Sequence, residues 1–300
     1  MDPKETYDEL LDLLVNNLAY LPDKPEENPR STLHTLWYFC CGSPKSTKEA
    51  YRSSLPELNS ENLYRLKELI DKRIQGTPLA HLTGIQEFMG LNFTVDACAL
   101  IPRKETEILG YAALKKIQHC ALNQPVVHVI DVCTGMGNLA LAFAAHESRA
   151  NILAADISEE AVALAKKNAS LLSLERQVDF FTGDLFGTID KERWEDSIDV
   201  VTCNPPYIST HKLEQMPREI IRYEPKEAFD GGIYGLGIIF RLLREAIPFL
   251  KDGGWLCFEV GLGQGEQLTR IMERNPTFKS IQQAKDKKGN VRAILAQISK

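Results

Sequence analysis

The sequence predicts an α/β protein with a mostly parallel sheet, preceded by a small helical domain and a β-hairpin linker. From about residue 105 to the C-terminus, short apolar segments alternate with amphipathic helical segments. Strands that alternate with helices are joined by right-handed crossovers, which give a parallel sheet covered on both faces. Before that point, apolar residues recur at helical spacing instead. We therefore expect a helical domain over residues 1–84, a hairpin linker over 85–101 and an α/β domain over 102–300.

The N-terminal domain is expected to hold three or four short helices. Two sets of apolar residues follow the spacing of one helix face. They are Leu10, Leu11, Leu14 and Leu18, and then Leu63, Leu66, Leu69 and Ile70. Breaks are expected at residues 21–30, which are rich in proline, and at residues 41–44. Residues 88–95, followed by 99–101, have the pattern of a β-hairpin.

Apolar runs and helical periodicity define the elements of the α/β domain. The runs predict strands at residues 126–132, 151–155, 178–182, 198–203, 255–260 and 291–298. The periodicity predicts helices at residues 105–118, 138–146, 158–172, 236–250 and 264–275. A polar or glycine-containing loop follows each of the first four strands. Open α/β sheets bind ligands at the carboxyl ends of their strands, so these loops are the candidate site.

Composition and charge limit the class of protein. Hydrophobic residues make up 44% and charged residues 25% of the 300 residues, which is typical of a soluble globular protein. The net charge is −6 and no basic block stands out, so an acidic enzyme with a basic protein partner fits better than an extended nucleic-acid surface. Seven cysteines without CxxC spacing, no signal peptide and no run of membrane-spanning length predict a reduced cytoplasmic protein. No metal-site spacing is present among the cysteines and histidines.

The tetrapeptide Asn204-Pro205-Pro206-Tyr207 follows the strand predicted at residues 198–203. The two prolines end the strand and stiffen the turn, and the first biases Asn204 towards an extended conformation. An amide and an aromatic ring are thereby held at a strand's carboxyl end, which suits the capture of a planar amide or amino nitrogen. The alternative is an ordinary proline turn with a half-buried tyrosine. We favour function, because three such loops converge on one sheet edge.

A second loop, Cys133-Thr134-Gly135-Met136-Gly137, joins a strand to a helix. Taken alone, it is better explained as an ordinary strand-to-helix turn, and Asp156 at the end of the next strand is what favours a ligand site. Glycine allows the backbone to approach a ligand closely, and the start of the helix offers free N–H groups. The next strand ends at Asp156, whose carboxylate can accept both hydroxyls of a ribose. The alternative role of Asp156 is to cap the following helix, but Ser158 can fill that role itself.

The third loop holds Asp184 and Leu185 after the strand at residues 178–182. Asp184 can accept a hydrogen bond from an adenine amino group, and Leu185 can cover the base. Taken alone, this segment is better explained as a surface turn. Its interest comes from its position beside the other two loops.

Together these residues resemble the class I S-adenosylmethionine methyltransferases. More narrowly, the chain resembles the protein-(glutamine-N5) methyltransferases of the release-factor type, the PrmC/HemK family. The resemblance covers most of the chain, and the order and spacing of its motifs make it specific. Besides the tetrapeptide, the motifs lie at residues 76–84, 87–91, 100–107, 223–225 and 286–292, the last being like the family's Asp-x-x-Gly-x-x-Arg.

The resemblance implies a seven-stranded methyltransferase sheet in residues 102–300 and a helical domain in residues 1–84 that recognises the substrate. It implies the substrate glutamine in the Gly-Gly-Gln loop of peptide-chain release factors and the cofactor S-adenosyl-L-methionine. The implied cofactor residues are Cys133, Thr134, Gly135, Met136, Gly137, Asp156, Asp184, Leu185 and Asn204. The implied catalytic residues are Asn204, Pro205, Pro206 and Tyr207. We expect release factors as partners, no direct nucleic-acid site, no membrane and a monomer.

Three departures from the family pattern stand out. Cys133 occupies the place of the first glycine of the loop, and Met136 replaces a small or hydroxylated residue. Because a side chain disfavours positive φ, we expect Cys133 to have ordinary dihedral angles. The pair Lys104-Glu105 replaces a more usual proline-acid pair.

The sequence leaves other functions open. One is a glutamine methyltransferase of a large-subunit ribosomal protein, which shares the Asn204–Tyr207 motif. Another is a DNA adenine-N6 methyltransferase, although such enzymes need a cationic surface and flip the base. A third is a cofactor-binding module without turnover. An NAD-dependent dehydrogenase is least favoured, since the longer glycine fingerprint is absent.

Overall fold

In the computed structural model, residues 3–19 and 24–300 are described, and they form two compact units. The helical unit contains the described residues up to Ala97, with Ile101–Arg103 and Pro217–Glu224. The sheet unit contains Cys98–Leu100, Lys104–Met216 and Pro225–Lys300. The segment at 217–224 therefore belongs to the helical unit, although the sequence places it between two elements of the sheet unit.

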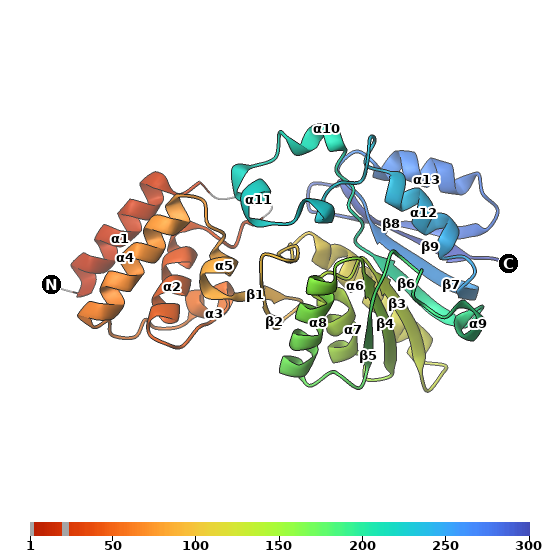
Figure 1. Ribbon diagram of the computed structural model, residues 1–300, viewed down its shortest axis with the longest axis horizontal. Coiled ribbons are helices and arrows are strands. Elements are labelled where there is room, and N and C mark those ends of the chain that lie inside the picture. Colours follow the sequence, from red (N-terminus) through yellow and green to blue (C-terminus); the bar gives the residue numbers. More distant parts are fainter. Residues whose placement is uncertain (1–2, 20–23) are drawn as a thin grey trace. The chain divides into compact units, whose positions relative to one another are not determined.

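The helical unit is built from short helices around a leucine-rich core (Figure 1). The N-terminal helices are α1 (Pro3–Asn17), α2 (Pro29–Cys40), α3 (Thr47–Arg52), α4 (Ser60–Ile74) and α5 (Leu79–Thr83), and α11 (Arg218–Tyr223) joins them. Side chains of Asn28, Ser46 and Asn59 cap α2, α3 and α4 by accepting backbone N–H bonds. Leu14, Leu36 and Leu66 are completely buried in the core.

A two-stranded hairpin completes the helical unit. Strands β1 (Ile85–Phe88) and β2 (Leu91–Thr94) are antiparallel. The turn residues Met89 and Gly90 both have positive φ, of 48° and 82°. Two such residues match the twist of the flanking strands, which explains the glycine.

The sheet unit contains seven strands in the order β5-β4-β3-β6-β7-β9-β8. The first five are parallel to one another, and β9 is antiparallel to both of its neighbours, β7 and β8. Their bounds are β3 (Val127–Val132), β4 (Ala150–Asp156), β5 (Val178–Thr182), β6 (Ile198–Cys203), β7 (Leu250–Glu259), β8 (Phe278–Lys285) and β9 (Val291–Ile298). The mostly parallel sheet predicted from the sequence is thus confirmed.

Helices cover both faces of this sheet (Figure 1). Helices α12 (Gly237–Glu245) and α13 (Gly265–Glu273) bury their apolar faces in one large core. The other layer consists of α6 (Thr106–Ala121), α7 (Asn138–His146) and α8 (Glu159–Leu172). The remaining short helices are α9 (Lys191–Trp194), α10 (Thr210–Leu213) and the 3-10 turn η1 (Lys226–Ala228). Strands covered on both faces read as continuous apolar runs, which is why β3 and β6 are evident in the sequence.

The structure corrects several expected elements. The helix expected at 236–250 ends at Glu245, and β7 begins at Leu250, because Pro248 disfavours helical geometry before it. Strand β8 was missed, since it lies at the sheet edge with a mixed polar pattern. The expected three or four N-terminal helices are five among the described residues, and residues 21–23 of the expected break lie outside them. Within the described residues, helices long and apolar enough to cross a membrane are absent.

Candidate active site

The candidate loops meet at one edge of the sheet. Strands β3, β4, β5, β6 and β7 are parallel, so their carboxyl ends lie on the same side. The chain runs from β3 outwards through β4 and β5 and then returns to place β6 on the other side of β3. This change of direction between β3 and β6 is a topological switch point, where open α/β sheets form their ligand crevice. The loop at 133–137 follows β3 and the tetrapeptide at 204–207 follows β6.

The loop at 133–137 has an unusual backbone. Gly135 and Gly137 have positive φ, and Gly137 begins α7 without a side-chain cap, which leaves backbone N–H groups for a ligand. Cys133 also has positive φ, of 57°, so the expectation of ordinary dihedrals was wrong. Its neighbour Thr134 explains how the strain is held: its N–H donates to Ala155 O and its hydroxyl to Asp131. Met136 is completely buried.

Two aspartates hold the loop at 133–137 in place by hydrogen bonds. Asp131 is completely buried and accepts 2.6 Å hydrogen bonds from the hydroxyls of Thr134 and Thr202. Burial raises its pKa to about 6, although the two hydroxyls favour the charged form. Asp156, at the end of β4, accepts from the N–H groups of Gly135 at 2.7 Å and Ser158 at 3.0 Å. Burial raises the pKa of Asp156 as well.

The capping role that competes for Asp156 is filled by another residue. The side chain of Ser158 accepts a hydrogen bond from the N–H of Ala161 and caps α8. This is the arrangement that the sequence indicated. The Asp156 carboxylate is therefore held by the loop at 133–137 and is not needed to cap α8.

The turn after β5 carries Asp184 and Leu185. Asp184 is exposed, and both of its carboxylate oxygens accept hydrogen bonds of 3.0 Å from Arg241 Nη1. Leu185 is buried and has φ of 50°. Non-glycine residues rarely adopt this conformation, and those that do cluster at functional sites. The loop after β3 and the turn after β5 thus each contain one non-glycine residue with positive φ.

The tetrapeptide is held rigidly by its surroundings. The side chain of Gln264 accepts from Gly261 N–H and donates to the carbonyl of Tyr207 at 3.0 Å. Gly231 and Gly235 lie directly against the tetrapeptide backbone, where an added Cβ would meet the Pro206 and Tyr207 carbonyl oxygens at 2.5 and 2.2 Å. Only glycine fits such an approach. Asn204 is half-buried, and its Nδ2 lies 3.5 Å from the Thr106 hydroxyl.

A buried ionic cluster lies beneath the tetrapeptide. The Tyr207 hydroxyl donates to Glu259 Oε1 at 3.0 Å, and Arg292 Nη2 lies 3.8 Å from the same oxygen and pairs closely with Glu105. Glu259 is 1% exposed, and burial raises its pKa to about 7. Burial and the neighbouring Glu259 raise the pKa of Tyr207 well above its ordinary value. Glu259 therefore faces the protein interior and not solvent.

Three further motifs, at residues 76–84, 100–107 and 223–225, are joined by hydrogen bonds inside the helical unit. The Glu224 carboxylate accepts from Ile101 N–H at 3.0 Å and from Arg103 at 2.6 Å. The Tyr223 hydroxyl hydrogen-bonds to Thr77. These bonds tie α11 to the segments at 76–84 and 100–107. The motifs lie far apart in the sequence, and these bonds bring them together in the structure.

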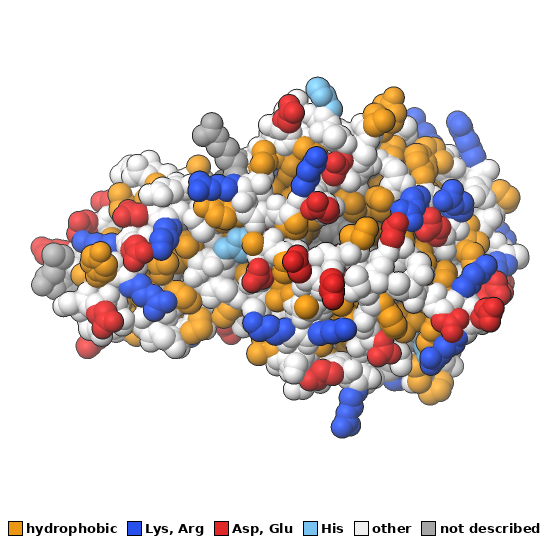
Figure 2. Space-filling view, in the orientation of Figure 1, with side chains coloured by type: hydrophobic (Ala, Val, Ile, Leu, Met, Phe, Trp, Pro, Cys, Tyr) orange, Lys and Arg blue, Asp and Glu red, His pale blue; other side chains and the backbone are white. Residues whose placement is uncertain are grey.

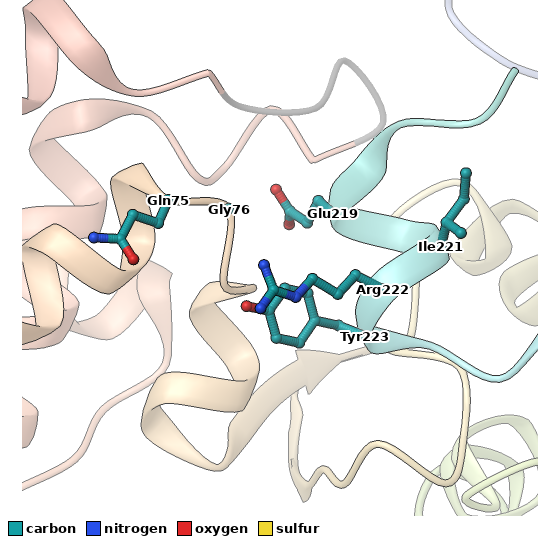
Figure 3. Close-up of a pocket in the computed structure, with 6 residues that line it drawn as sticks. All are labelled: Gln75, Gly76, Glu219, Ile221, Arg222 and Tyr223. Atoms are coloured by element: carbon teal, nitrogen blue, oxygen red, sulfur yellow. The ribbon is translucent and has the colours of Figure 1, made fainter.

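The helical unit also contains a cavity of about 310 Å³. Figure 3 shows Glu219, Ile221, Arg222 and Tyr223 of α11 on one side, and Gln75 and Gly76 after α4 on the other. Beside it, Arg73 pairs with both Glu27 and Glu219 at 3.0 Å. None of the residues expected at the site lines this cavity.

Sequence reasoning missed four side chains of the sheet edge. Asp131 and Gln264 lie outside the motifs that carry the resemblance, and their partners come from other loops. Thr106 and Arg292 lie within the motifs at 100–107 and 286–292, but the sequence does not show that Thr106 meets Asn204 or that Arg292 lies beneath Tyr207. The one available signal was a polar residue that interrupts or borders an apolar strand, as Asp131 does in β3.

Comparison with known proteins defines the class of this fold and site. Residues 116–234 match the family described as "Methyltransferase small domain". Among solved structures, the hMettl16 catalytic domain in complex with a 3'UTR hairpin has a TM-score of 0.55 and 15% identity, covering 76% of this chain and 81% of that chain. At this identity the likeness concerns the fold alone. The sheet, its switch point and these matches define the fold as that of the class I methyltransferases.

Closer relatives identify the family. A protein of Geobacter sulfurreducens named "Release factor glutamine methyltransferase" is 35% identical over 85% of each chain. Proteins of the same name from Rhodopirellula baltica and Moorella thermoacetica are 32% and 36% identical, covering 95% and 90% of this chain and 95% and 92% of theirs. The chain belongs to the release factor glutamine methyltransferase family. The resemblance seen in its motifs is thereby confirmed.

Proposed function

We propose that this enzyme transfers a methyl group from S-adenosyl-L-methionine to the side-chain amide nitrogen of the glutamine in the Gly-Gly-Gln motif of peptide-chain release factors. Relatives named "Release factor glutamine methyltransferase" align with 85%, 95% and 90% of the chain, which supports this choice of substrate. The observation that carries the chemistry is the position of Asn204–Tyr207 at the end of β6, beside the loop that follows β3.

The residues of the sheet edge fit the cofactor. The uncapped start of α7 offers N–H groups to a carboxylate, and Asp156 can accept hydrogen bonds from ribose hydroxyls. In this proposal Cys133, Thr134, Gly135 and Gly137 line the cofactor. Met136, whose side chain is buried, contributes only through its backbone.

The other end of the cofactor meets the turn after β5. We assign Leu185 to the adenine face and Asp184 to its amino group, for which the carboxylate must share or leave Arg241. The buried acids at this edge also suit a cationic sulfonium, because opposite charges attract strongly where water is excluded. The cofactor supplies an activated methyl group.

The chain's own residues hold the substrate amide. An amide nitrogen is a poor nucleophile, because its lone pair is delocalised into the carbonyl. We assign the Asn204 side-chain oxygen and the Pro205 carbonyl as acceptors of the two substrate N–H groups, which aims the nitrogen lone pair at the methyl group. Pro206 fixes this turn, and Tyr207 packs against the amide plane and excludes water.

The domains divide the work in the same proposal. Residues 1–84 recognise the release factor, residues 85–101 form the linker and residues 102–300 carry out the transfer. On the face in Figure 2, acidic and basic side chains of the described residues are interspersed, which favours a protein partner over an extended nucleic-acid surface. We propose that the enzyme acts as a monomer in the cytoplasm.

The test is methyl transfer to a purified release factor, with mass spectrometry of the glutamine. Asn204→Ala should lower turnover about 100- to 1,000-fold, because it removes an acceptor that matters most in the transition state. Asn123→Ala, at an exposed position beyond α6, is the matched control and should leave turnover unchanged. Transfer to a ribosomal protein or to duplex DNA instead of the release factor would contradict the proposal, and so would an active Asn204→Ala variant.

A further inference from the structure

The turn that follows η1 carries two apolar side chains into solvent. Ile233 and Tyr234 are 79% and 82% exposed, more than any other large hydrophobic side chain in the described part of the chain. They are the central residues of a turn that Gly235 N–H closes by donating to the Gly232 carbonyl at 3.0 Å. Leu262, in the loop after β7, is 66% exposed. Exposed apolar residues that occur singly are ordinary, but neighbouring ones mark interaction sites.

The side chain of Gln264 joins this turn to the loop after β7 and to the tetrapeptide at 204–207. Its Oε1 accepts from Gly261 N–H at 2.8 Å, and its Nε2 donates to the carbonyls of Tyr207 at 3.0 Å and Gly235 at 3.3 Å. The side-chain amide therefore forms hydrogen bonds to three separate backbone segments. It fixes the turn and the loop after β7 against the same end of the tetrapeptide.

Both segments also touch Tyr207 directly. A Cβ added to Gly235 would meet the Tyr207 carbonyl oxygen at 2.2 Å, and one added to Gly261 would meet its ring carbon Cδ2 at 3.0 Å. Each glycine is the chain neighbour of one of the exposed apolar residues. These apolar residues therefore border the tetrapeptide from two loops, and we call the three of them the apolar rim: Ile233, Tyr234 and Leu262.

The turn is anchored on both sides, so its apolar tip is held in solvent by backbone hydrogen bonds. On the N-terminal side, Gly231 N–H donates to the Ile208 carbonyl at 2.8 Å, and Thr210 N–H donates to the Gly232 carbonyl at 3.0 Å. On the C-terminal side, Gln264 holds the last carbonyl of the turn. A surface that is already ordered loses less conformational entropy when a partner binds. The turn thus has the properties of a preformed binding surface.

The reach of the substrate side chain indicates what covers this surface. A glutamine side chain places its amide nitrogen only about 5 Å from its own Cα. When Asn204 and Pro205 hold that nitrogen, the main chain on either side of the glutamine has to lie close to the loops that contact Tyr207. In a Gly-Gly-Gln motif the two residues before the glutamine have no side chains, so their backbone can lie directly against an apolar or aromatic surface.

We propose that the apolar rim is a docking surface for the release factor and receives the main chain that flanks the substrate glutamine. The inference rests on the proposed function, because the identity of the substrate comes from there. Gln264 is a positioning residue in this account: it contacts neither the glutamine nor the cofactor, and it acts by holding both loops of the rim at the tetrapeptide. The rim contributes to substrate binding and not to the chemical step, because its contacts do not change as the methyl group moves.

The first experiment measures methylation kinetics with purified release factor. The double variant Ile233→Ser/Tyr234→Ser should raise the KM for the release factor at least about tenfold, because it removes the two most exposed apolar contacts. At saturating release factor its kcat should stay within about twofold of the wild type. Leu122→Ser is the matched control: Leu122 is 74% exposed and lies between α6 and the amino end of β3, at the opposite edge of the sheet. Its KM should not change.

The second experiment tests whether Gln264 acts through the rim. Gln264→Glu keeps an acceptor for Gly261 N–H but replaces the donor to the two carbonyls by a second oxygen. It should raise the KM for the release factor, whereas Gln267→Glu, at an exposed position of the same helix, should not. Combined with the double rim variant, Gln264→Glu should raise this KM by less than the product of the separate effects, because both remove the same contact. A full product would refute the positioning role of Gln264.

The third experiment needs no turnover. Calorimetry should show that the double rim variant binds the release factor at least about tenfold more weakly than the wild type, with the affinity for S-adenosyl-L-methionine unchanged. Equal affinity and equal KM for the release factor in the two proteins would overturn the inference. A loss of cofactor affinity would overturn it as well, because the rim would then cover the cofactor. So would a wild-type dimer in analytical ultracentrifugation that the double variant converts to monomers, because a second copy would then occupy the rim.

Failure of the proposed function has a different signature. A wild-type enzyme that binds the release factor through the rim but does not methylate it would refute the transfer and leave the docking surface standing. A wild-type enzyme that methylates the release factor with the same KM as the double variant would refute the docking surface and leave the transfer standing.

Discussion

Each of the two units contains a buried ionic cluster. The two clusters are built from similar residue types but differ in their net charge. In the helical unit, Lys24, Glu27, Arg73 and Glu219 are all buried and carry two positive and two negative charges. In the sheet unit, Glu105, Glu259 and Arg292 carry one positive and two negative charges. The first cluster is balanced, and the second has one acid too many.

The imbalance changes what each cluster can do. A balanced buried cluster holds elements in place, and here it ties α4 to α11. It is a weak source of net stability but is costly to break. In the second cluster, burial raises the pKa of Glu259 to about 7 and the charge of Glu105 adds to the rise, so Glu259 is only partly ionised near neutral pH. Asp131, with its pKa raised to about 6, shows the same effect in the same edge of the sheet. The first cluster thus holds α4 and α11 together, whereas the charge of the second cluster changes with pH near neutrality.

The largest expected effect is on the balanced cluster. Arg73→Met leaves two buried carboxylates with one lysine, and removal of one partner from a buried pair typically costs about 3–5 kcal/mol. The free energy of local unfolding of α2 and α4, measured by hydrogen exchange with mass spectrometry, should fall by that amount.

Lys72 is the matched control for Arg73, because it is the adjacent residue on α4. It pairs with Glu68 in an exposed i,i+4 bridge at 2.7 Å. Lys72→Met should leave the exchange of α2 and α4 unchanged within error, since exposed pairs contribute little. Similar effects of the two substitutions would remove the distinction between a buried and an exposed network.

The second prediction concerns the pH dependence of stability. The pKa of Glu259 is raised from an ordinary 4.5 to about 7 in the folded protein, so between these values the native state binds more protons than the unfolded state. Stability contributed by this group is therefore complete below pH 4.5 and declines as pH rises to about 7. At about 1.4 kcal/mol per pKa unit, the loss is about 3 kcal/mol.

Glu259→Gln should remove that decline. The difference in unfolding free energy between Glu259→Gln and the wild type should shift in favour of the variant by about 3 kcal/mol as pH rises through this window. Asp131 is present in both proteins and cancels in the difference. Denaturant titrations at several pH values measure it. A difference that does not vary with pH would show that Glu259 is not the responding group.

The third prediction concerns Asp156. Asp156→Ala removes the acceptor of the Gly135 N–H and the proposed ribose ligand, so cofactor affinity measured by calorimetry should fall at least about tenfold. The same substitution should lower the pKa of Asp131, because the charge of Asp156 helps to raise it. Unchanged affinity would remove Asp156 from the site. An unchanged Asp131 pKa, followed by NMR, would show that the acids of this edge act independently.

The smallest effect is expected at the exposed pair of Arg241 and Asp184. Arg241→Gln breaks a contact in which the Asp184 side chain is 53% exposed, and such pairs contribute at most about 1 kcal/mol. Cofactor affinity should change by less than about threefold. A larger gain would mean that Arg241 competes with the adenine for Asp184, and a larger loss would place Arg241 itself in the cofactor site.

Much of the sheet unit can be predicted from the sequence, because strands buried on both faces have unbroken apolar runs. β5, β6, β9 and α7 begin and end at the residues that the pattern predicts. Strand β8 could not be predicted, because this edge strand mixes polar and apolar residues. The early end of α12 was also missed, because Pro248 interrupts a run with helical periodicity. The positive φ of Cys133 was also unexpected, because neighbouring hydrogen bonds override the local preference of the residue.

The sequence by itself determined the alternation of strands and helices, the three polar loops and the motifs that identify the family. These depend on local properties: hydrophobic period, proline stiffness and glycine freedom. Only the tertiary structure decided that Thr106, Glu259 and Arg292 lie beneath Asn204 and Tyr207, and that residues 217–224 belong to the helical unit. Those relations join positions 50 to 200 residues apart in the chain. They follow from strand order and burial, which no local pattern specifies.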